Sequence, residues 1–279
     1  MWFVRRRPLV SLVILAALIA AATTVEAQFR RGFGRGFGSV RLSTPADVDG
    51  SFQFCRIIFN GDFRGDGQGG SWNVDWPRAD INLSIRLSEL TKTTVGRAPT
   101  GDPSHLLMRL SDDTLFQCPF IMMTEVGSLY MNDEEAERLR IYLLKGGFLW
   151  ADDFWGSYAW EVFESEMRKV FPPSEHPIVD LPLSHPLWRT QFEMKDGAPQ
   201  ISAIGNWQRG VLSERGADSA EVHVRAIFDD HDRIMVLITH NTDFGDSYER
   251  EGDNPDYFYQ MSVPGYAFGI NTLLYAMTH

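Results

Sequence analysis

Residues 132–170 decide the fold; they read NDEEAERLRIYLLKGGFLWADDFWGSYAWEVFESEMRKV. Asn132 and the three acids after it predict a helix start, because an N-cap side chain and acidic residues both favour a helix N-terminus. This helix is expected to end at Gly146-Gly147, where glycine can take the left-handed cap conformation. Phe148–Ala151 then predicts a buried strand, and Ser157–Val170 predicts a second helix.

Strand and helix patterns alternate on both sides of this unit. Before it, short apolar runs predict three strands and one run with helical spacing predicts a helix: Phe52–Phe59, His105–Leu110 and Phe120–Thr124 are the strands, and Ala79–Thr91 is the helix. Asn60-Gly61 is expected to end the first strand as a turn. Late in the chain, Val222–Phe228 and Ile234–Thr239 predict an antiparallel hairpin, and Tyr266–Thr278 predicts a final helix. We therefore expect an α/β fold with a mostly parallel sheet and helices on both faces.

The N-terminus is typical of a secretory signal peptide over residues 1–27. Three arginines, Arg5–Arg7, precede the apolar run Leu9–Ala22, and Val25-Glu26-Ala27 offers a cleavage site before Gln28. The run is shorter than the roughly 20 apolar residues that a bilayer span needs. We therefore expect a periplasmic or extracellular protein that has no membrane span after cleavage. An uncleaved N-terminal anchor is the alternative.

A basic arm follows the signal. Residues 28–50 are rich in glycine, arginine and phenylalanine, and Arg-Gly-Phe-Gly occurs twice, at 31–34 and 35–38. This low-complexity stretch contains too much glycine to pack. It is expected to serve either as a solvated linker or as a contact for an anionic envelope polymer or lipid surface. Residues 51–279 are expected to form a single α/β domain.

Composition and charge exclude several classes of protein. The chain has 279 residues, 44% of them hydrophobic, which is enough for a substantial core. Its net charge of −11 argues against nucleic acid as a partner. Two cysteines cannot build a four-cysteine zinc site. The sequence has no G-x-S-x-G elbow, no G-x-x-x-x-G-K-[ST] phosphate loop and no H-E-x-x-H pair, so no cofactor is evident.

Polar residues follow the predicted strands at the points where the strands end. Because the carboxyl ends of parallel strands meet at one edge of a sheet, these side chains are expected to gather there. Carboxylates near a histidine can bind a divalent cation or act in general acid–base chemistry. Tryptophans on the same loops can stack on a sugar or another planar ligand. The candidate ligand-binding residues are Asp62, Asp66, Trp72, Glu125, Asp152, Asp153, Trp155, His240 and Asp243.

Helix capping is the alternative role for these acids, because carboxylates at helix N-termini accept backbone hydrogen bonds and complement the helix dipole. Asp152 and Asp153 are adjacent, so at most one of them is expected to face the crevice. The other is expected to accept hydrogen bonds from backbone amides at a helix start. His240 and Asp243 follow the last strand, and their side chains are expected to converge on the crevice-facing acid.

Three stretches carry a resemblance to a known family. They are LLKGGFLWADDFW at 143–155, HPLWRT at 185–190 and MVLITHNTDFGD at 235–246. Over residues 51–279 the chain resembles the bacterial exported domain-of-unknown-function family DUF4159. More distantly, the helix that leads into GGFLWADD and a later His-Pro turn resemble the class I glutamine amidotransferase-like fold. That resemblance implies a flavodoxin-like three-layer sandwich and carries no activity.

The amidotransferase machinery itself is absent from the sequence. Its nucleophile is a cysteine on a Gly-flanked elbow, whereas Cys55 lies inside a predicted strand and Cys118 precedes Pro119. None of the seven histidines is followed two positions later by glutamate. We therefore expect a non-catalytic binding or scaffold module of the cell envelope, with an envelope protein or polymer as partner. The alternative is a hydrolase that uses the acidic, metal-binding residues on a saccharide or another envelope substrate.

The sequence leaves open whether the two cysteines pair. Thiols outside the cytoplasm tend to form disulfides. Cys55 and Cys118 lie at the starts of the first and third predicted strands, which are neighbours in a flavodoxin-like order. A buried cysteine also serves well as a small apolar residue, and strand neighbours can strain a disulfide.

Overall fold

The computed structural model describes residues 40–61 and 71–279 of the chain. The expected signal peptide and most of the basic arm lie outside the described residues, as do Asp62 and Asp66. Residues 42–279 form one compact unit. This unit begins before the domain boundary that we expected at residue 51, because Ser43 already bonds to the sheet: its amide donates to the carbonyl of Leu107 at 2.8 Å.

Seven strands form one sheet in the order β3-β1-β4-β6-β9-β8-β7. Strands β3, β1, β4, β6 and β9 run parallel to one another, whereas β8 and β7 are antiparallel to their neighbours. The mostly parallel sheet and the late antiparallel hairpin are therefore confirmed. The strands span β1 (Phe54–Ile57), β3 (His105–Met108), β4 (Phe120–Thr124), β6 (Phe148–Asp152), β7 (Val179–Asp180), β8 (His223–Phe228) and β9 (Ile234–His240).

Asn60-Gly61 does not form the turn that we expected after the first strand. These two residues form β2 (Asn60–Gly61), which pairs antiparallel with β5 (Leu129–Tyr130) in a separate two-stranded sheet. The first strand of the main sheet is also shorter than predicted, because it ends at Ile57. The apolar run that continues to Phe59 reflects burial of that side chain in the core rather than pairing within the main sheet.

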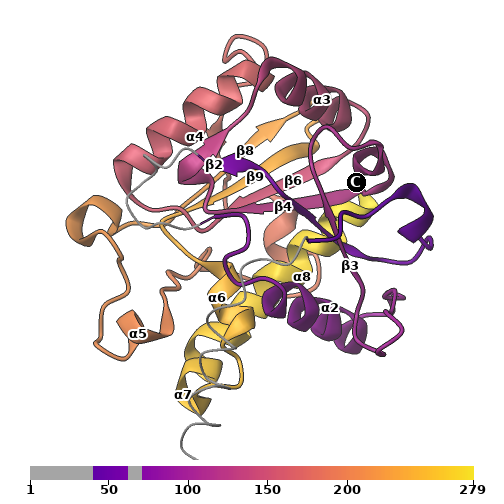
Figure 1. The fold of residues 1–279 in the computed structure, drawn as a ribbon. Coiled ribbons are helices and arrows are strands. Elements are labelled where there is room, and N and C mark those ends of the chain that lie inside the picture. Colours follow the sequence, from indigo (N-terminus) through magenta and orange to yellow (C-terminus); the bar gives the residue numbers. More distant parts are fainter. Residues whose placement is uncertain (1–39, 62–70) are drawn as a thin grey trace, which may run out of the picture. The chain divides into compact units, whose positions relative to one another are not determined.

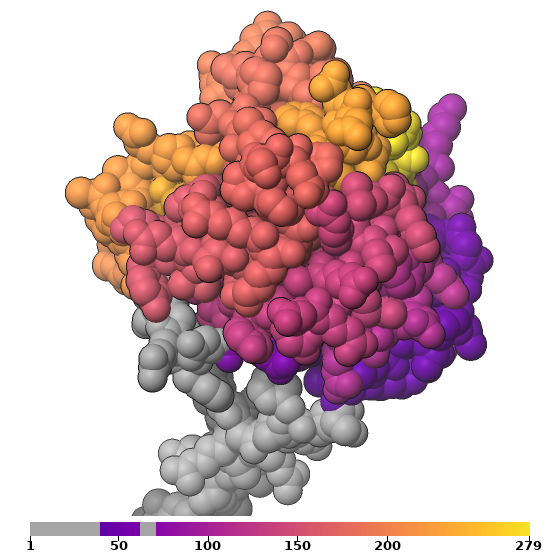
Figure 2. Space-filling model, turned by 90° about the horizontal axis from the view of Figure 1, so that it is seen from above, coloured from indigo at the N-terminus to yellow at the C-terminus, as the bar shows by residue number. Residues whose placement is uncertain are grey.

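Helices cover both faces of the sheet (Figure 1). Helices α3 (Asp133–Leu144) and α4 (Gly156–Val170) pack on one face, and Figure 2 views the molecule from this side. Helices α2 (Arg78–Leu90), α6 (Phe244–Glu249) and α8 (Val263–Thr278) pack on the other. This three-layer arrangement is consistent with a flavodoxin-like sandwich. The remaining helical segments are α5 (Ile204–Trp207), α7 (Pro255–Tyr257), η1 (Pro45–Asp47), η2 (Asp113–Gln117), η3 (Val126–Ser128), η4 (Pro186–Arg189), η5 (Gly216–Ser219) and the π-helical turn η6 (Phe258–Ser262).

Alternating side chains of the strands fill two hydrophobic cores, one on each side of the sheet. Successive residues of a strand point to opposite faces, so one strand contributes to both cores. In β6, Leu149 packs toward α3 and α4, while Trp150 packs toward α2 and α8. Both side chains are fully buried. The burial of every β6 residue explains why this strand reads as a continuous apolar run.

The predicted start of α3 is confirmed in detail. The Asn132 side chain accepts a hydrogen bond from the Glu135 amide at 2.9 Å, and the Glu135 carboxylate accepts one from the Asn132 amide at 3.0 Å. This reciprocal capping box satisfies two amides that the helix itself leaves without partners.

The C-terminal helix α8 is apolar and packs against the sheet. Its buried side chains include Phe268, Ile270 and Leu273. Within the described part of the chain, none of the helices has both the length and the apolar character that crossing a membrane requires.

The two cysteines, whose pairing the sequence does not decide, form a disulfide in the structure. Cys55 of β1 and Cys118, just before β4, are bonded to each other, and 63 positions separate them in the sequence. Strands β1 and β4 are neighbours in the sheet, which brings the two residues together. Closing a loop of this length stabilises a fold by about 4 kcal/mol in the chain-entropy model.

A buried ion pair fixes the loop that precedes α2. Arg56 of β1 and Asp80 of α2 are both fully buried, and their closest charged atoms lie 2.5 Å apart. The same guanidinium donates to the carbonyls of Trp72 and Val74 at 3.1 and 3.4 Å, and to the Thr124 hydroxyl at 2.8 Å. Arg56 therefore joins β1, β4, α2 and the loop through residues 72–74.

Asp80→Asn is predicted to lower the free energy of unfolding by about 3–5 kcal/mol, because it leaves the buried Arg56 charge without its partner. Chemical denaturation of both proteins measures the difference. Asp113→Asn is the matched control, because the Asp113 side chain is 89% exposed and pairs with Arg138 at the surface. That control is expected to cost less than about 1 kcal/mol. Equal losses in the two variants would contradict the role of the buried pair.

Candidate functional site

Four loops meet at the edge of the sheet where the parallel strands end. In these loops, Asp75, Glu125, Asp153 and Asn241 all have positive φ, between 55° and 64°. Glu125, Asp153 and Asn241 come directly after β4, β6 and β9. Such left-handed backbone is uncommon outside glycine, costs about 1–3 kcal/mol per residue, and clusters at functional sites.

The loops are bonded to one another through their backbones. The Glu125 amide donates to the carbonyl of Asp153 at 3.0 Å, and the Asn241 amide donates to the carbonyl of Phe154 at 3.0 Å. This edge also holds the point where the strand order reverses, because the chain passes from β1 to β3 on one side and then to β4 on the other. Open α/β sheets bind ligands at such a point.

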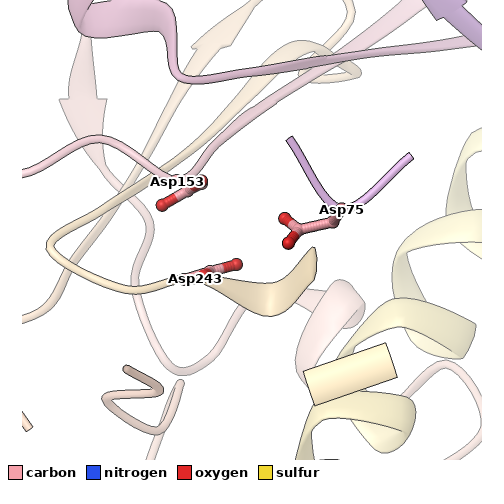
Figure 3. Close-up of side chains that lie close together, drawn as sticks. All are labelled: Asp75, Asp153 and Asp243. Atoms are coloured by element: carbon pink, nitrogen blue, oxygen red, sulfur yellow. The ribbon is translucent and has the colours of Figure 1, made fainter. Parts of the chain in front are cut away.

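Three aspartates from different loops converge at this edge, and we call them the acidic triad: Asp75, Asp153 and Asp243. One carboxylate oxygen from each lies within 4.8 Å of those from the other two. Figure 3 shows the three carboxylates turned toward a common space. Their side chains are buried, with residue exposures of 8%, 4% and 5%. Three like charges are therefore held close together and away from bulk water.

The carboxylates of Asp153 and Asp243 accept hydrogen bonds from protein groups, whereas one oxygen of the Asp75 carboxylate accepts none from the described residues. Asp153 accepts a hydrogen bond from the indole nitrogen of Trp155 at 3.1 Å. Asp243 caps α6 by accepting from the amide of Asp246 at 2.7 Å. In contrast, Oδ2 of Asp75 is buried and has no hydrogen-bond partner among the described residues. A buried carboxylate oxygen without a donor is costly and calls for an explanation.

Burial and mutual repulsion raise the pKa values of the triad. Burial raises the pKa of Asp75 well above its usual range; the charge of Asp246 raises it further, and Arg56 opposes this shift. For Asp153 burial acts with the charge of Glu125, and for Asp243 it acts with the charge of Asp153. In the described part of the chain, no lysine or arginine forms an ion pair with any of the three.

Asp152 differs from its neighbour Asp153 because protein groups satisfy its carboxylate. It is fully buried, and it accepts from the amides of Phe244 and Gly245 at 2.9 and 3.3 Å and from the Thr239 hydroxyl at 2.5 Å. Asp152 thus holds the start of α6, while Asp153 joins the acidic triad. This division matches the expectation that only one of the adjacent acids faces the crevice.

Asp75 also belongs to a second acidic group, formed with Asp246 and Glu249 of α6. One carboxylate oxygen from each of these three residues lies within 4.8 Å of the others. Gly245 makes this approach feasible, since a Cβ atom at that position would overlap Oδ2 of Asp75. Arg250 lies at this group, with its Nη2 at 2.8 Å from Glu249 and its Nε at 3.4 Å from Asp246.

A site of this composition favours a hard cation. Every candidate ligand atom in the two acidic groups is a carboxylate oxygen. Oxygen donors suit Ca²⁺, Mg²⁺ and Mn²⁺, whereas zinc and copper sites are built largely from nitrogen and sulfur donors. A dication would bind the Asp75 oxygen that lacks a donor and would offset the repulsion within the triad.

A family model described as "Domain of unknown function (DUF4159)" matches residues 55–277. The chain belongs to this family. The match extends from β1 to the last turns of α8 and therefore includes every residue of both acidic groups. No curated protein matches the chain.

Several of the residues proposed from the sequence take part in other interactions in this DUF4159 domain. Asp62 and Asp66 lie outside the described residues. Glu125 is buried next to the triad, and its charge acts on Asp153. Trp72 is half-buried and packs against the core on the α3–α4 side. The prediction that Trp155 stacks on a ligand is wrong, because its ring is only 1% exposed and its indole nitrogen donates to Asp153.

The expected convergence of His240 on the acids is also wrong. Its Nε2 atom pairs with the carbonyl of Gly156 at 3.0 Å, and its ring lies among those of Phe154, Trp160 and His223. Side chains alternate along β9, so Thr239 reaches Asp152 while His240 points to the opposite face. Burial lowers the pKa of His240 to about 4, so the imidazole is neutral near pH 7.

Sequence reasoning missed Asp75, Asp246 and Glu249. Asp75 follows a long glycine-rich loop and lies next to α2, and nothing in its neighbours WNVDWP marks it as a strand-end residue. Asp246 lies in the first turn of α6, where an acid has an ordinary explanation in the helix dipole. The one usable signal was the density of acids in TDFGDSYERE at 242–251.

Without a divalent cation, the DUF4159 domain is predicted to lose stability as the pH rises from about 4 to about 7. Burial raises the pKa of Asp152 to about 7 and that of Asp246 to about 6, from 3.8. The folded state therefore keeps protons that the unfolded chain has released, and its relative free energy rises with pH. Urea unfolding in chelator at several pH values measures this slope. A stability that increases over the same range would contradict the electrostatics of the site.

Proposed function

We propose that this chain is an exported, non-catalytic binding module of the cell envelope that holds a hard divalent cation in the acidic triad. The observation that carries the cation site is the buried Asp75 carboxylate: its Oδ2 has no hydrogen-bond partner among the described residues, and one of its oxygens lies within 4.8 Å of carboxylate oxygens of Asp153 and Asp243. The loop before α2 and the loops after β6 and β9 supply the three ligands. A cation bound there would fasten these loops together at the carboxyl edge of the sheet.

Two features support export. Residues 1–27 have the order of charged start, apolar run and small-residue cleavage site that marks a secretory signal. The Cys55–Cys118 disulfide suits the same location, because structural disulfides persist mainly in oxidising compartments.

Two features favour binding over catalysis. Both cysteines are used in one disulfide, so neither supplies the thiolate that amidotransferase chemistry needs. The members of the acidic triad are at most 8% exposed, so a saccharide chain has little access to the carboxylates. A buried cation in such a place orders the surrounding loops, and those loops then present the surface to an envelope protein or polymer.

The addition of Ca²⁺, Mg²⁺ or Mn²⁺ to the chelator-treated protein is predicted to raise its melting temperature. A ligand that binds only the native state at a hundred times its Kd adds about 2.7 kcal/mol, or roughly 5 °C or more in a domain of this size. Asp75→Asn is expected to abolish this cation-dependent rise. It is not expected to lower the melting temperature in chelator, because it removes one of several repelling charges.

Asp152→Asn is the matched control, since it changes an adjacent buried aspartate that the protein itself satisfies. It is expected to lower stability by about 1–3 kcal/mol, because an amide NH2 replaces the oxygen that accepts from the Thr239 hydroxyl, while the Asn carbonyl oxygen can still accept from the two backbone amides. Its cation-dependent rise should remain. The proposal fails if none of the three cations shifts the wild-type melting temperature, or if Asp75→Asn keeps the full shift.

A further inference from the structure

We propose that Asp75, Asp246 and Glu249 form a second cation position, linked to the first because Asp75 bridges the two. This inference rests on the proposed function, since Asp75 is also a ligand of the acidic triad. Each of the two groups has its three candidate oxygens within 4.8 Å of one another, and Asp75 is the only residue that they share.

The local structure of α6 places both new ligands on the side of Asp75. Asp246 and Glu249 are three residues apart, so they lie on the same face of the helix. Phe244 and Gly245, at the start of α6, donate their amides to Asp152, which fixes the helix against β6. Gly245 has no side chain between the helix and the Asp75 carboxylate. The approach of α6 to Asp75 is therefore built into the fold.

Asp75 has the properties of a bridging ligand. Asp75 is more than nine-tenths buried, and its Oδ2 atom has no donor among the residues that the structure describes. A carboxylate has two oxygens and can bind one cation with each, and paired cations in proteins lie about 3.5–4 Å apart. Two cations that share the Asp75 carboxylate would lie at about this spacing.

The balance of charge favours two cations over one. The two groups contain five carboxylates. Arg250 is the cation that pairs with them; it contacts Asp246 and Glu249 and also reaches Asp253 at 3.6 Å. Five carboxylates and one guanidinium leave four negative charges, which two dications neutralise. With a single dication, two of the carboxyl groups would either stay charged away from water, which is costly, or keep their protons.

The second position is the outer one and is expected to exchange its cation more readily. The Glu249 side chain is 19% exposed and the Arg250 side chain is 38% exposed, whereas the Asp246 side chain is only 7% exposed. A cation reaching this position from solvent therefore meets Glu249 and Arg250 first. Before a cation binds, the Arg250 guanidinium neutralises part of the charge of Asp246 and Glu249. It has to move away from Glu249 when the cation binds.

The stoichiometry of bound Mn²⁺ tests the inference. The full chain is stripped with chelator and titrated with Mn²⁺, and bound metal is measured by elemental analysis and by electron paramagnetic resonance. Two Mn²⁺ per chain are expected, with the spectrum of an exchange-coupled pair, because a shared carboxylate holds the ions close together. One Mn²⁺ per chain with the spectrum of an isolated ion overturns the second position and leaves the proposed function intact. No bound Mn²⁺ overturns the second position, and the proposed function falls with it if Ca²⁺ and Mg²⁺ also leave the melting temperature unchanged.

Glu249→Gln is expected to reduce the stoichiometry from two to one and to abolish the coupled spectrum. Glu164→Gln is its matched control, because Glu164 is also a partly exposed helical glutamate paired with an arginine, Arg168, at 3.0 Å. This control should retain two Mn²⁺. Two Mn²⁺ with a coupled spectrum in Glu249→Gln would overturn the assignment of the ligands.

Arg250→Gln gives an independent measurement that does not remove a ligand. Loss of the competing positive charge is expected to tighten the second binding step by about fivefold or more, while the first step changes less. Weaker binding at the second step would overturn the proposed role of Arg250. Circular dichroism of each variant checks folding. If Glu249→Gln does not fold, the wild-type stoichiometry and the Arg250→Gln titration still decide the question.

Discussion

Repulsion among buried carboxylates is the constraint on which the rest of this structure depends. Asp75, Asp153 and Asp243 bring like charges together at a place with little water, and burial drives their pKa values upward. Such an arrangement survives only if other interactions hold the loops in place. Arg56 anchors the loop before Asp75, and Asp152 anchors α6 beside Asp243. These contacts thus hold the three carboxylates together although they repel one another, and a bound cation would offset that repulsion.

The parallel sheet explains why these acids meet. Strands β1, β4, β6 and β9 all end at the same edge, and the residues that follow three of them take left-handed backbone conformations. Those conformations turn the chain sharply. The Asp153 side chain can therefore approach Asp75 and Asp243, although Asp152, one residue earlier, bonds to the start of α6. The antiparallel strands β8 and β7 follow β9 in the sheet. His240 at the end of β9 packs against the rings of Trp160 and His223.

The sequence predicts the layers of this fold well because local signals agree with one another. Asn132 and Glu135 form the expected capping box, and the fully buried strand Phe148–Asp152 lies at the centre of the sheet. Asp153 and Asp243 could be predicted because Asp153 directly follows β6 and Asp243 stands three positions after the end of β9. Side-chain direction could not be predicted, since positive φ values break the simple alternation along a strand. Trp155 comes shortly after Asp153, whose positive φ turns the chain, so the contact of its indole with Asp153 could not be predicted. His240 follows the ordinary alternation along β9 and points away from the acids, and Asp75 lies in the loop before α2, well after the nearest preceding strand.

Diffraction from crystals grown with Mn²⁺, measured for anomalous scattering, tests the cation site most directly. Manganese gives a strong anomalous signal that locates the ion without reference to any assumed ligand. We expect a peak between the carboxylates of Asp75, Asp153 and Asp243, at the distances of about 2.0–2.6 Å that oxygen ligands keep from hard cations. A Mn²⁺-saturated crystal without a peak at the acidic triad would contradict the proposed site.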